Sequence, residues 1–347
     1  MLSAGLISVT ESWFNLSRDS QTELLEVAAG RSGHPAHLLE KDIWVVWLLS
    51  VIYRSSIADK LTFKGGTSLS KVYKIINRFS EDLDLTYDIR ELVPDLLYSS
   101  NPIPVSIAQG KKITSAIRHR LSEWIKTTVK PIIEHALTAN NLPAKVTVEG
   151  KESNKLIVSY SAIKHGSGYS KATVQLEFGA RATGEPNRFY SVTCDIAAVI
   201  NGIKFPTAQP LVMMAERTFW EKATAVHVYC LQERLRGERY SRHWYDLDAM
   251  SKSVYFNRAL NDRDLAQKVA GHKSIFFPEK DLNSNKINYL KAVSGFIQIV
   301  PEGDSLIALE HDYTAMLEDG LLALNQPNFP ELIASCRTIQ DRINQLP

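Results

Sequence analysis

The chain of 347 residues contains little cysteine, no long hydrophobic run and almost no net charge. Its three cysteines, Cys194, Cys230 and Cys336, are odd in number and have no paired spacing, which argues against a disulfide framework and a zinc site. The longest mainly apolar run, residues 43–53, is shorter than the roughly 20 residues that cross a bilayer. Residues 1–8 lack the basic start and apolar stretch of a signal peptide. We therefore predict a cytoplasmic protein without a membrane partner.

The net charge of +2 does not by itself indicate a nucleic-acid-binding protein. Basic residues nevertheless cluster in two segments, and such clusters can follow a phosphate backbone. Each cluster could also be a solvent-exposed helix face that acidic residues balance elsewhere. The first cluster contains Lys111, Lys112, Arg118 and Arg120, and the second contains Arg234, Arg236, Arg239 and Arg242.

The chain is longer than a single small core requires, so we expect either two domains or one large domain with insertions. Hydrophobic periodicity predicts helices over residues 10–53, a mixed α/β centre, and helices after Pro210. The predicted fold class is α/β (α+β) with a mixed sheet in residues 1–205 and a largely helical C-terminal domain in residues 206–347. In the centre we predict strands at residues 61–63, 83–87, 145–149, 156–160, 173–178 and 191–200, a helix at 68–76, and a helix at 106–139 that Pro131 could break.

Two aspartates, Asp82 and Asp84, alternate with Leu83 and Leu85. Side chains two residues apart on a strand point to the same face, so the carboxylates would lie side by side while the leucines enter a core. Two such carboxylates repel each other unless a cation lies between them. Hard carboxylate oxygens suit Mg²⁺, which usually binds through one or two carboxylates and the phosphates of a substrate. The pattern therefore predicts a Mg²⁺ or Mn²⁺ site for phosphate chemistry.

A paired glycine, Gly65-Gly66, precedes the aspartates and is followed by Thr67 and Ser68. Glycine permits unusual dihedrals and close approach, so backbone N–H groups at this turn could contact a phosphate. The turn and the aspartates are therefore expected to serve the same phosphorylated ligand.

Glu177, in the predicted strand 173–178, is a candidate for a third carboxylate. Its apolar neighbours would face the core, so Glu177 would face the side where an adjacent strand could carry Asp82 and Asp84. Three acids on one surface would make a two-metal site for in-line phosphoryl chemistry. Glu177 could also be an exposed strand residue, and Asp195 is the competing third acid.

Lys222 emerges from a mainly apolar helical segment, where its charge would suit a triphosphate. Arg242 and Asp246 lie four residues apart on one helical face, and they could pair or reach into the same cleft. They could also form only an ion-pair brace between helices. His227 and His243 have no partner at triad or metal spacing, so we predict packing roles for both.

Together these residues resemble the ordered motifs of the AbiEii/AbiGii nucleotidyltransferase toxin family. The resemblance extends from about residue 38 to about residue 250, and the order of four motifs makes it specific. A preceding segment, Glu40-Lys41-Asp42-Ile43-Trp44, resembles the N-terminal helix of that family. The four motifs are Gly65-Gly66-Thr67-Ser68-Leu69-Ser70, Arg78-Phe79-Ser80-Glu81-Asp82-Leu83-Asp84-Leu85, Glu216-Arg217-Thr218-Phe219-Trp220-Glu221-Lys222 and Arg242-His243-Trp244-Tyr245-Asp246-Leu247.

The resemblance implies a polymerase-β-like nucleotidyltransferase core followed by a helical domain. Members of the family are typically the toxin half of bacterial toxin–antitoxin or phage-defence systems, and relatives transfer nucleotides to RNA, including tRNA acceptor ends. A cognate antitoxin is therefore an expected partner. The resemblance implies catalytic roles for Asp82, Asp84, Lys222 and Asp246. It implies nucleotide binding by Gly65, Gly66, Thr67, Ser68, Lys222 and Arg242. It also implies metal binding by Asp82 and Asp84, to which we add Glu177 from strand geometry.

We therefore predict a Mg²⁺-dependent enzyme that transfers a nucleotide from an NTP to an acceptor hydroxyl, namely an RNA or tRNA 3′ end. Asp246 would orient or deprotonate that hydroxyl, or would position Lys222 and Arg242. A protein-nucleotidylating enzyme is one alternative. A non-catalytic nucleotide-binding partner of an antitoxin is the other.

Overall fold

A computed structural model describes residues 11–80, 82–97, 106–164, 171–233, 240–318, 322 and 326–346. Two helices open this part of the chain, α1 (Arg18–Ser32) and α2 (Ala36–Tyr53), separated by Gly33-His34-Pro35. Gly33 ends α1 with a φ of +73°, a conformation that favours glycine. The helix α2 is apolar around most of its circumference, and it is buried accordingly.

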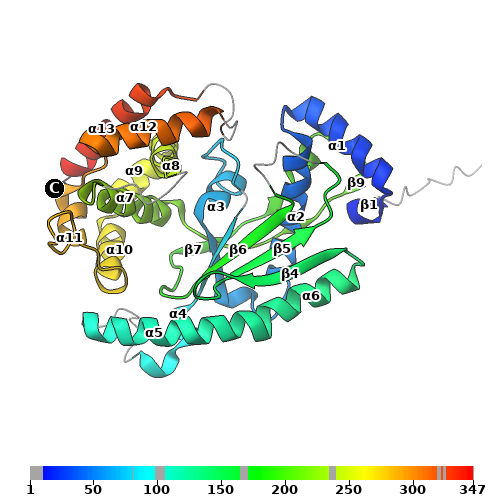
Figure 1. The fold of residues 1–347 in the computed structure, drawn as a ribbon, viewed down its shortest axis with the longest axis horizontal. Coiled ribbons are helices and arrows are strands. Elements are labelled where there is room, and N and C mark those ends of the chain that lie inside the picture. The colour runs from blue at the N-terminus through cyan, green and yellow to red at the C-terminus, as the bar shows by residue number, and fades with distance from the viewer. Residues whose placement is uncertain are drawn as a thin grey trace, which may run out of the picture.

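A seven-stranded mixed sheet forms the centre of the molecule, in the order β4-β5-β6-β3-β2-β11-β7. Strand β3 runs antiparallel to β2 and parallel to β6, while β2 runs parallel to β11. Figure 1 shows this sheet between the N-terminal helices on one side and the C-terminal helices on the other. Its strands are β2 (Leu61–Lys64), β3 (Leu83–Tyr87), β4 (Ala144–Glu149), β5 (Lys155–Tyr160), β6 (Thr173–Gly179), β7 (Asn187–Phe189) and β11 (Leu211–Met213).

Alternation along the strands decides which residues face the core. Leu83 and Leu85 on β3 are buried, as are Leu176 and Phe178 on β6. Aromatic contacts cover this face, for example the edge contact of Trp124 with Phe178, whose ring centroids lie 5.9 Å apart. The residues between them, including the acidic ones, therefore face the opposite side of the sheet.

The predicted helix 106–139 is confirmed and passes through Pro131 without a break. It consists of α5 (Ile107–Trp124), a π-helical turn (Ile125–Val129) and α6 (Lys130–Ala139). Pro131 lies in the first turn of α6, where its missing N–H and its ring are tolerated next to the wider π turn. The tested fold prediction, a mixed α/β centre with helices around it, is thus confirmed.

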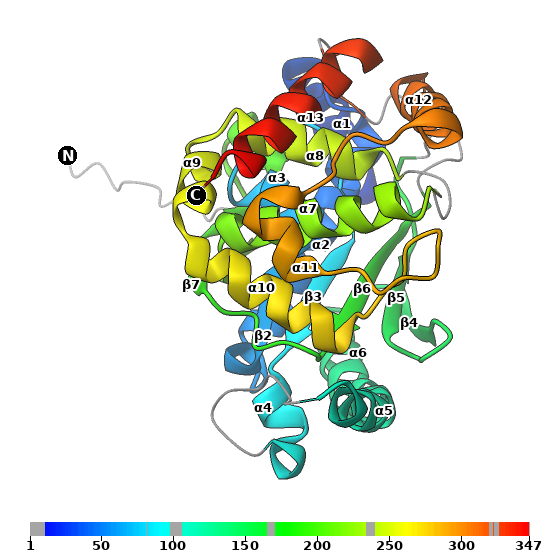
Figure 2. The same cartoon turned by 90° about the vertical axis from the view of Figure 1, so that its left-hand side faces the viewer.

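The C-terminal part is helical, as predicted (Figure 2). None of the helices in the described ranges is both long enough and apolar enough to span a bilayer. The helices are α7 (Ala215–Leu231), α8 (Arg242–Ser251), α9 (Val254–Asn261), α10 (Arg263–Phe276), α11 (Tyr289–Lys291), α12 (Gly303–Glu318) and α13 (Phe329–Asn344).

Two element predictions were wrong. The helix expected at residues 68–76 is α3 (Gly65–Lys71), which begins at the paired glycine itself. The strand expected at residues 191–200 is only β8 (Val192–Thr193), followed by a 3-10 turn (Asp195–Ala198), because only two residues find a partner, in β10 (Thr207–Ala208). The remaining short elements are β1 (Glu11–Ser12), β9 (Ile203–Lys204) and α4 (Ile89–Leu92). Strand β11 continues the sheet beyond residue 205, and the domain division at that point stays a prediction.

Candidate active site

Three carboxylates meet on the sheet face opposite the core. Asp84 lies on β3 directly beside Glu177 of β6, in the parallel register of the two strands. Asp82 precedes β3, two residues before Asp84. On the other side of β3, Lys64 at the end of β2 lies opposite Asp84 in the antiparallel register of the two strands. The structure therefore places Asp84 and Glu177 side by side, with Asp82 just before the same strand.

The paired glycine allows side chains to lie directly against the backbone. Gly65 has a φ of +80°, and a Cβ atom there would overlap the Asp84 carboxylate. A Cβ atom at Gly66 would overlap the Arg78 guanidinium and would lie 2.7 Å from the Ser80 hydroxyl. Both positions therefore require glycine for the close approach of polar side chains.

Thr67 and Ser68, which follow the glycines, are fully buried. The Thr67 hydroxyl donates to the Asp82 carbonyl at 2.5 Å, and the Ser68 hydroxyl donates to the Gly65 carbonyl at 2.9 Å. Both hydroxyls thus hold the turn in shape. Because both hydroxyls already donate to carbonyls, the backbone N–H groups at the start of α3 are the donors that this segment can offer to a phosphate.

Asp246 is fully buried and is held by two cations from other parts of the chain. Arg78 donates to both carboxylate oxygens, with Nε 2.7 Å from Oδ1 and Nη2 2.9 Å from Oδ2. Lys222 Nζ lies 2.8 Å from Oδ2. Burial alone would raise the pKa of Asp246, but the charges of Arg78 and Lys222 hold it well below its usual value.

Arg242 is not the partner of Asp246, although the two lie one helical turn apart. It is half-buried at the start of α8 and forms no ion pair or hydrogen bond with any residue in the described ranges. The cation that takes its place is Arg78, from the loop before β3. Asp246 therefore does form an ion pair, as the alternative interpretation expected. The pair joins α8 to Arg78 in the loop before β3, and not to Arg242 in the first turn of α8.

The Asp84 carboxylate accepts no hydrogen bond and forms no ion pair within the described part of the chain. Burial raises its pKa to about 6, the neighbouring Glu177 and Asp82 charges add to the shift, and Lys64 and Lys222 oppose it. A half-buried carboxylate without a bonding partner, next to a second one, fits a cation ligand. In the described ranges, however, no three acidic, histidine or cysteine side chains converge closely enough to hold a metal ion by themselves.

The two candidates for the third acid differ in their surroundings. Glu177 lies beside Asp84, and its carboxylate pairs with Lys155 at 2.8 Å. Asp195 lies in the turn after β8, where it pairs with Lys71 at 2.9 Å. Position therefore favours Glu177 over Asp195.

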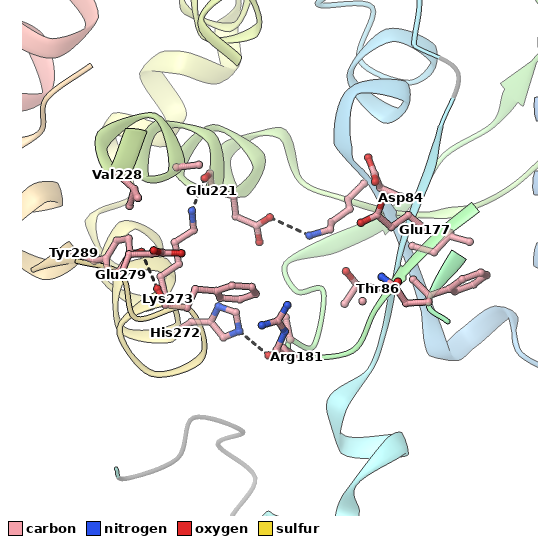
Figure 3. A pocket seen from close by; sticks show the side chains of 18 of the residues that line it. Asp84, Thr86, Glu177, Arg181, Glu221, Val228, His272, Lys273, Glu279 and Tyr289 are labelled. Carbon is pink, nitrogen blue, oxygen red and sulfur yellow. Dashed lines mark hydrogen bonds and ion pairs between the residues drawn. The ribbon is translucent and has the colours of Figure 1, made fainter. Parts of the chain in front are cut away.

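A pocket of about 410 Å³ opens between the sheet and the C-terminal helices. Figure 3 shows Asp84, Thr86 and Glu177 on one side of it and Glu221, His272 and Lys273 on the other. The remaining described residues that line it are Lys64, Leu85, Asn154, Phe178, Gly179, Arg181, Ala182, Ala225, Val228, Tyr229, Phe277, Glu279 and Tyr289.

An ion pair crosses the pocket from the sheet to α7. Lys64 Nζ lies 3.3 Å from Glu221 Oε2, and Arg217 Nε lies 3.1 Å from Glu221 Oε1. The Lys273 amine donates to the Glu221 backbone carbonyl at 2.7 Å, and burial lowers the pKa of Lys273 to about 8. The pocket therefore contains a lysine whose charge no described carboxylate neutralises directly.

Sequence reasoning assigned no role to Arg78, Glu221, Lys64, Lys273 or Arg181. Arg78 and Glu221 lie inside the motifs on which the resemblance rests, so their positions in those motifs could have identified them as site residues. Lys273 and Arg181 lie outside every motif, and only the fold brings them to the pocket.

Arg118, Arg120 and His227 follow the simpler interpretation, whereas the buried Nδ1 of His243 has no hydrogen-bond partner among the described residues. Arg118 pairs with Glu152 at 2.8 Å, and Arg120 pairs with Asp95. His227 is buried and accepts a hydrogen bond from a backbone N–H, as expected for a packing residue. Three members of the second cluster, Arg234, Arg236 and Arg239, lie outside the described residues.

Comparison with protein families agrees with the motif analysis. The model of the family described as nucleotidyl transferase AbiEii toxin, type IV toxin–antitoxin system, matches residues 47–335. Among curated proteins, none matches the chain. A similar solved structure is the nucleotidyltransferase toxin MenT4 of Mycobacterium tuberculosis H37Rv, with 17% identity and a TM-score of 0.49 over 96% of this chain and 91% of that chain.

The family match covers most of the chain and includes all four motifs. This match confirms the resemblance, and it implies an enzyme that uses a nucleotide substrate and has an antitoxin as its partner. The chain therefore belongs to the AbiEii family of nucleotidyltransferase toxins from type IV toxin–antitoxin systems.

Proposed function

We propose that this toxin transfers a nucleotide from an NTP to the 3′ hydroxyl of an RNA, with tRNA as the expected acceptor. The proposal rests on the position of the Asp84 carboxylate. It lies beside Glu177 and close to the charge of Lys222, and it forms no hydrogen bond or ion pair with a described residue. Family membership supports the reaction class, and the geometry supports a site for it at this edge of the sheet.

The residues fit a divalent cation. Asp82 and Asp84 would hold Mg²⁺ or Mn²⁺, with Glu177 as the third ligand once it releases Lys155. When bound, such a cation offsets the negative charge on the phosphate oxygens of the NTP. Mg²⁺ usually binds through a few carboxylates together with substrate phosphates, so oxygens of the NTP would complete the ligand set.

The cations around Asp246 would serve the triphosphate. We assign Lys222 to the departing pyrophosphate, Arg242 to a second nucleotide contact, and the backbone of residues 65–68 to the β and γ phosphates. Asp246 is assigned as a positioning residue, because both of its oxygens already accept from Arg78 and Lys222. A fully buried carboxylate in that state is a poor base for an acceptor hydroxyl.

We further propose that the enzyme acts in the cytoplasm, as part of a defence against phage, and is restrained by a cognate antitoxin. The three cysteines are free and buried, as is usual for proteins of a reducing compartment.

Incubation with each labelled NTP, Mg²⁺ or Mn²⁺, and either total RNA or total protein tests the acceptor. Label in the RNA fraction, and within it at the 3′ end of tRNA, is the expected result. Label in the protein fraction would instead identify a protein-nucleotidylating enzyme. Label in neither fraction with all four NTPs and both metals would contradict the proposal and favour binding without turnover.

A further inference from the structure

The pocket extends from Asp84 along two strands, and neither residue of the paired glycine lines it. It follows β3 from Asp84 to Thr86 and β6 from Glu177 to Gly179. Neither α3 nor Arg78 nor Lys222 contributes to its described lining. Asp84 therefore lines the pocket and also lies close to the charge of Lys222, which does not line it.

Transfer of a nucleotide requires the attacking and leaving oxygens to lie roughly in line on opposite sides of the phosphorus. If the pyrophosphate departs toward Lys222, the attacking hydroxyl approaches from the pocket side of Asp84. The acceptor, rather than the departing phosphates, should therefore occupy the pocket.

An arginine and an aromatic ring form one wall of the pocket. The Arg181 guanidinium carbon lies 4.0 Å from the centre of the Phe277 ring, and Phe277 is 36% exposed. Arg181 makes one weak hydrogen bond, to the Phe276 carbonyl at 3.4 Å, and no ion pair with described residues. This wall therefore offers a positive charge without a carboxylate partner and an accessible aromatic surface.

Partly buried hydrogen bonds fix both members of this wall through their backbones. His272 Nε2 lies 2.6 Å from the Arg181 carbonyl, and the Tyr289 hydroxyl donates to the Phe277 carbonyl at 2.8 Å. Lys273 adds a second cation nearby, since the carboxylate of Glu221 is already bound by Lys64 and Arg217. The wall is thus held in place before any ligand arrives.

A smaller hollow extends the pocket along α5. It shares Phe178, Gly179 and Arg181 with the pocket and reaches Arg118 on α5. Because Arg118 is paired there with Glu152 at 2.8 Å, Arg181 is the cation without a described carboxylate partner where the two hollows meet.

We propose that this pocket binds the 3′-terminal nucleotides of a single-stranded RNA acceptor, with Arg181 on a backbone phosphate and Phe277 stacked on a base. Alternating cationic and aromatic contacts are how proteins hold single strands without reading their sequence. The assignment rests on the proposed function, because it takes the acceptor to be RNA.

The test measures binding of a short single-stranded oligoribonucleotide, labelled at its 5′ end, by fluorescence anisotropy over a range of salt concentrations and without NTP. Arg181→Met keeps the stem over Phe277 but removes the charge, so the slope of log affinity against log salt should fall by about 0.7. Phe277→Ala should weaken binding about tenfold without changing that slope, and Phe277→Trp should restore it. Arg337→Ala, an exposed arginine on α13, is the matched control and should bind as the wild type does.

Equal binding by the wild type, Arg181→Met and Phe277→Ala would overturn the assignment. An increase in KM for the NTP with unchanged binding of the oligoribonucleotide would also overturn it, because the pocket would then hold the incoming nucleotide. The binding assay needs no turnover, so it separates this inference from the proposed function. If the wild type labels no RNA, the proposed function fails, while the binding comparison still decides what the pocket holds.

Discussion

Asp246 illustrates how single residues of this site differ from their predicted roles. Its spacing from Arg242 suggested a pair within one helix, but its partners are Arg78 and Lys222. Arg78 lies 168 positions away in the sequence, so no spacing rule could reveal the contact. Lys222 was predicted as a functional cation because its charge, on a mainly apolar helix, would suit a triphosphate, and in the structure that charge is paired with Asp246.

Lys222→Ala should lower the rate of nucleotide transfer by about 10²- to 10³-fold while the fold survives, because Arg78 still neutralises Asp246. Lys252→Ala is the matched control, since Lys252 also pairs with a buried aspartate, Asp248, at 2.7 Å. Steady-state kinetics on both variants check this. Equal rates for Lys222→Ala and the control would make Lys222 a structural residue only.

His227 supplies a prediction about stability and pH. Burial lowers the pKa of His227 to about 4, and its Nδ1 accepts a hydrogen bond from the Gln298 N–H at 2.9 Å. The unfolded state therefore binds the extra proton between about pH 6.5 and pH 4, so stability falls as the pH falls through this window, by about 3 kcal/mol in total. Asparagine can keep the acceptor but cannot titrate, so His227→Asn should flatten this part of the stability profile in urea unfolding. An unchanged slope in His227→Asn would contradict the assignment.

At the scale of elements, the unit that builds the site is β2, α3 and β3. Strand β3 matched its prediction because Leu83 and Leu85 alternate with polar residues and find a core. The start of α3 was missed because two glycines indicate a turn, whereas here they open a helix against which side chains pack. The predicted strand at residues 191–200 failed for a related reason, since an apolar sequence forms a strand only where a partner strand is available.

Gly65→Ala tests the packing of Asp84 on this unit. The substitution strains a residue whose φ is +80° and also displaces the Asp84 carboxylate. Gly202→Ala is the matched control, because Gly202 has a φ of +81° and open space around its Cβ position. Both variants should lose about 1 to 2 kcal/mol of unfolding free energy from the backbone conformation, but only Gly65→Ala should also lose transfer activity. Comparable activity in the two variants would show that the close approach of Asp84 to Gly65 is not needed.

At the scale of the whole molecule, the site forms where the sheet packs against the C-terminal helices. The four motifs and their order could be recognised in the sequence, and that was enough for the family. The pocket could not be predicted, because Arg181, Lys273 and Phe277 belong to no motif and meet only when α10 packs near the end of β6. The Lys64–Glu221 pair, which joins the sheet to α7, is a contact of the same kind.

The central claim is that Asp82 and Asp84 carry nucleotide transfer to RNA. The most direct measurement is the incorporation of labelled nucleotide into total RNA by the wild type and by Asp82→Asn/Asp84→Asn, with both proteins shown to be folded by circular dichroism. Removal of both cation ligands should lower incorporation by about 10³-fold or more without loss of the fold. Full incorporation by the double variant would contradict the account.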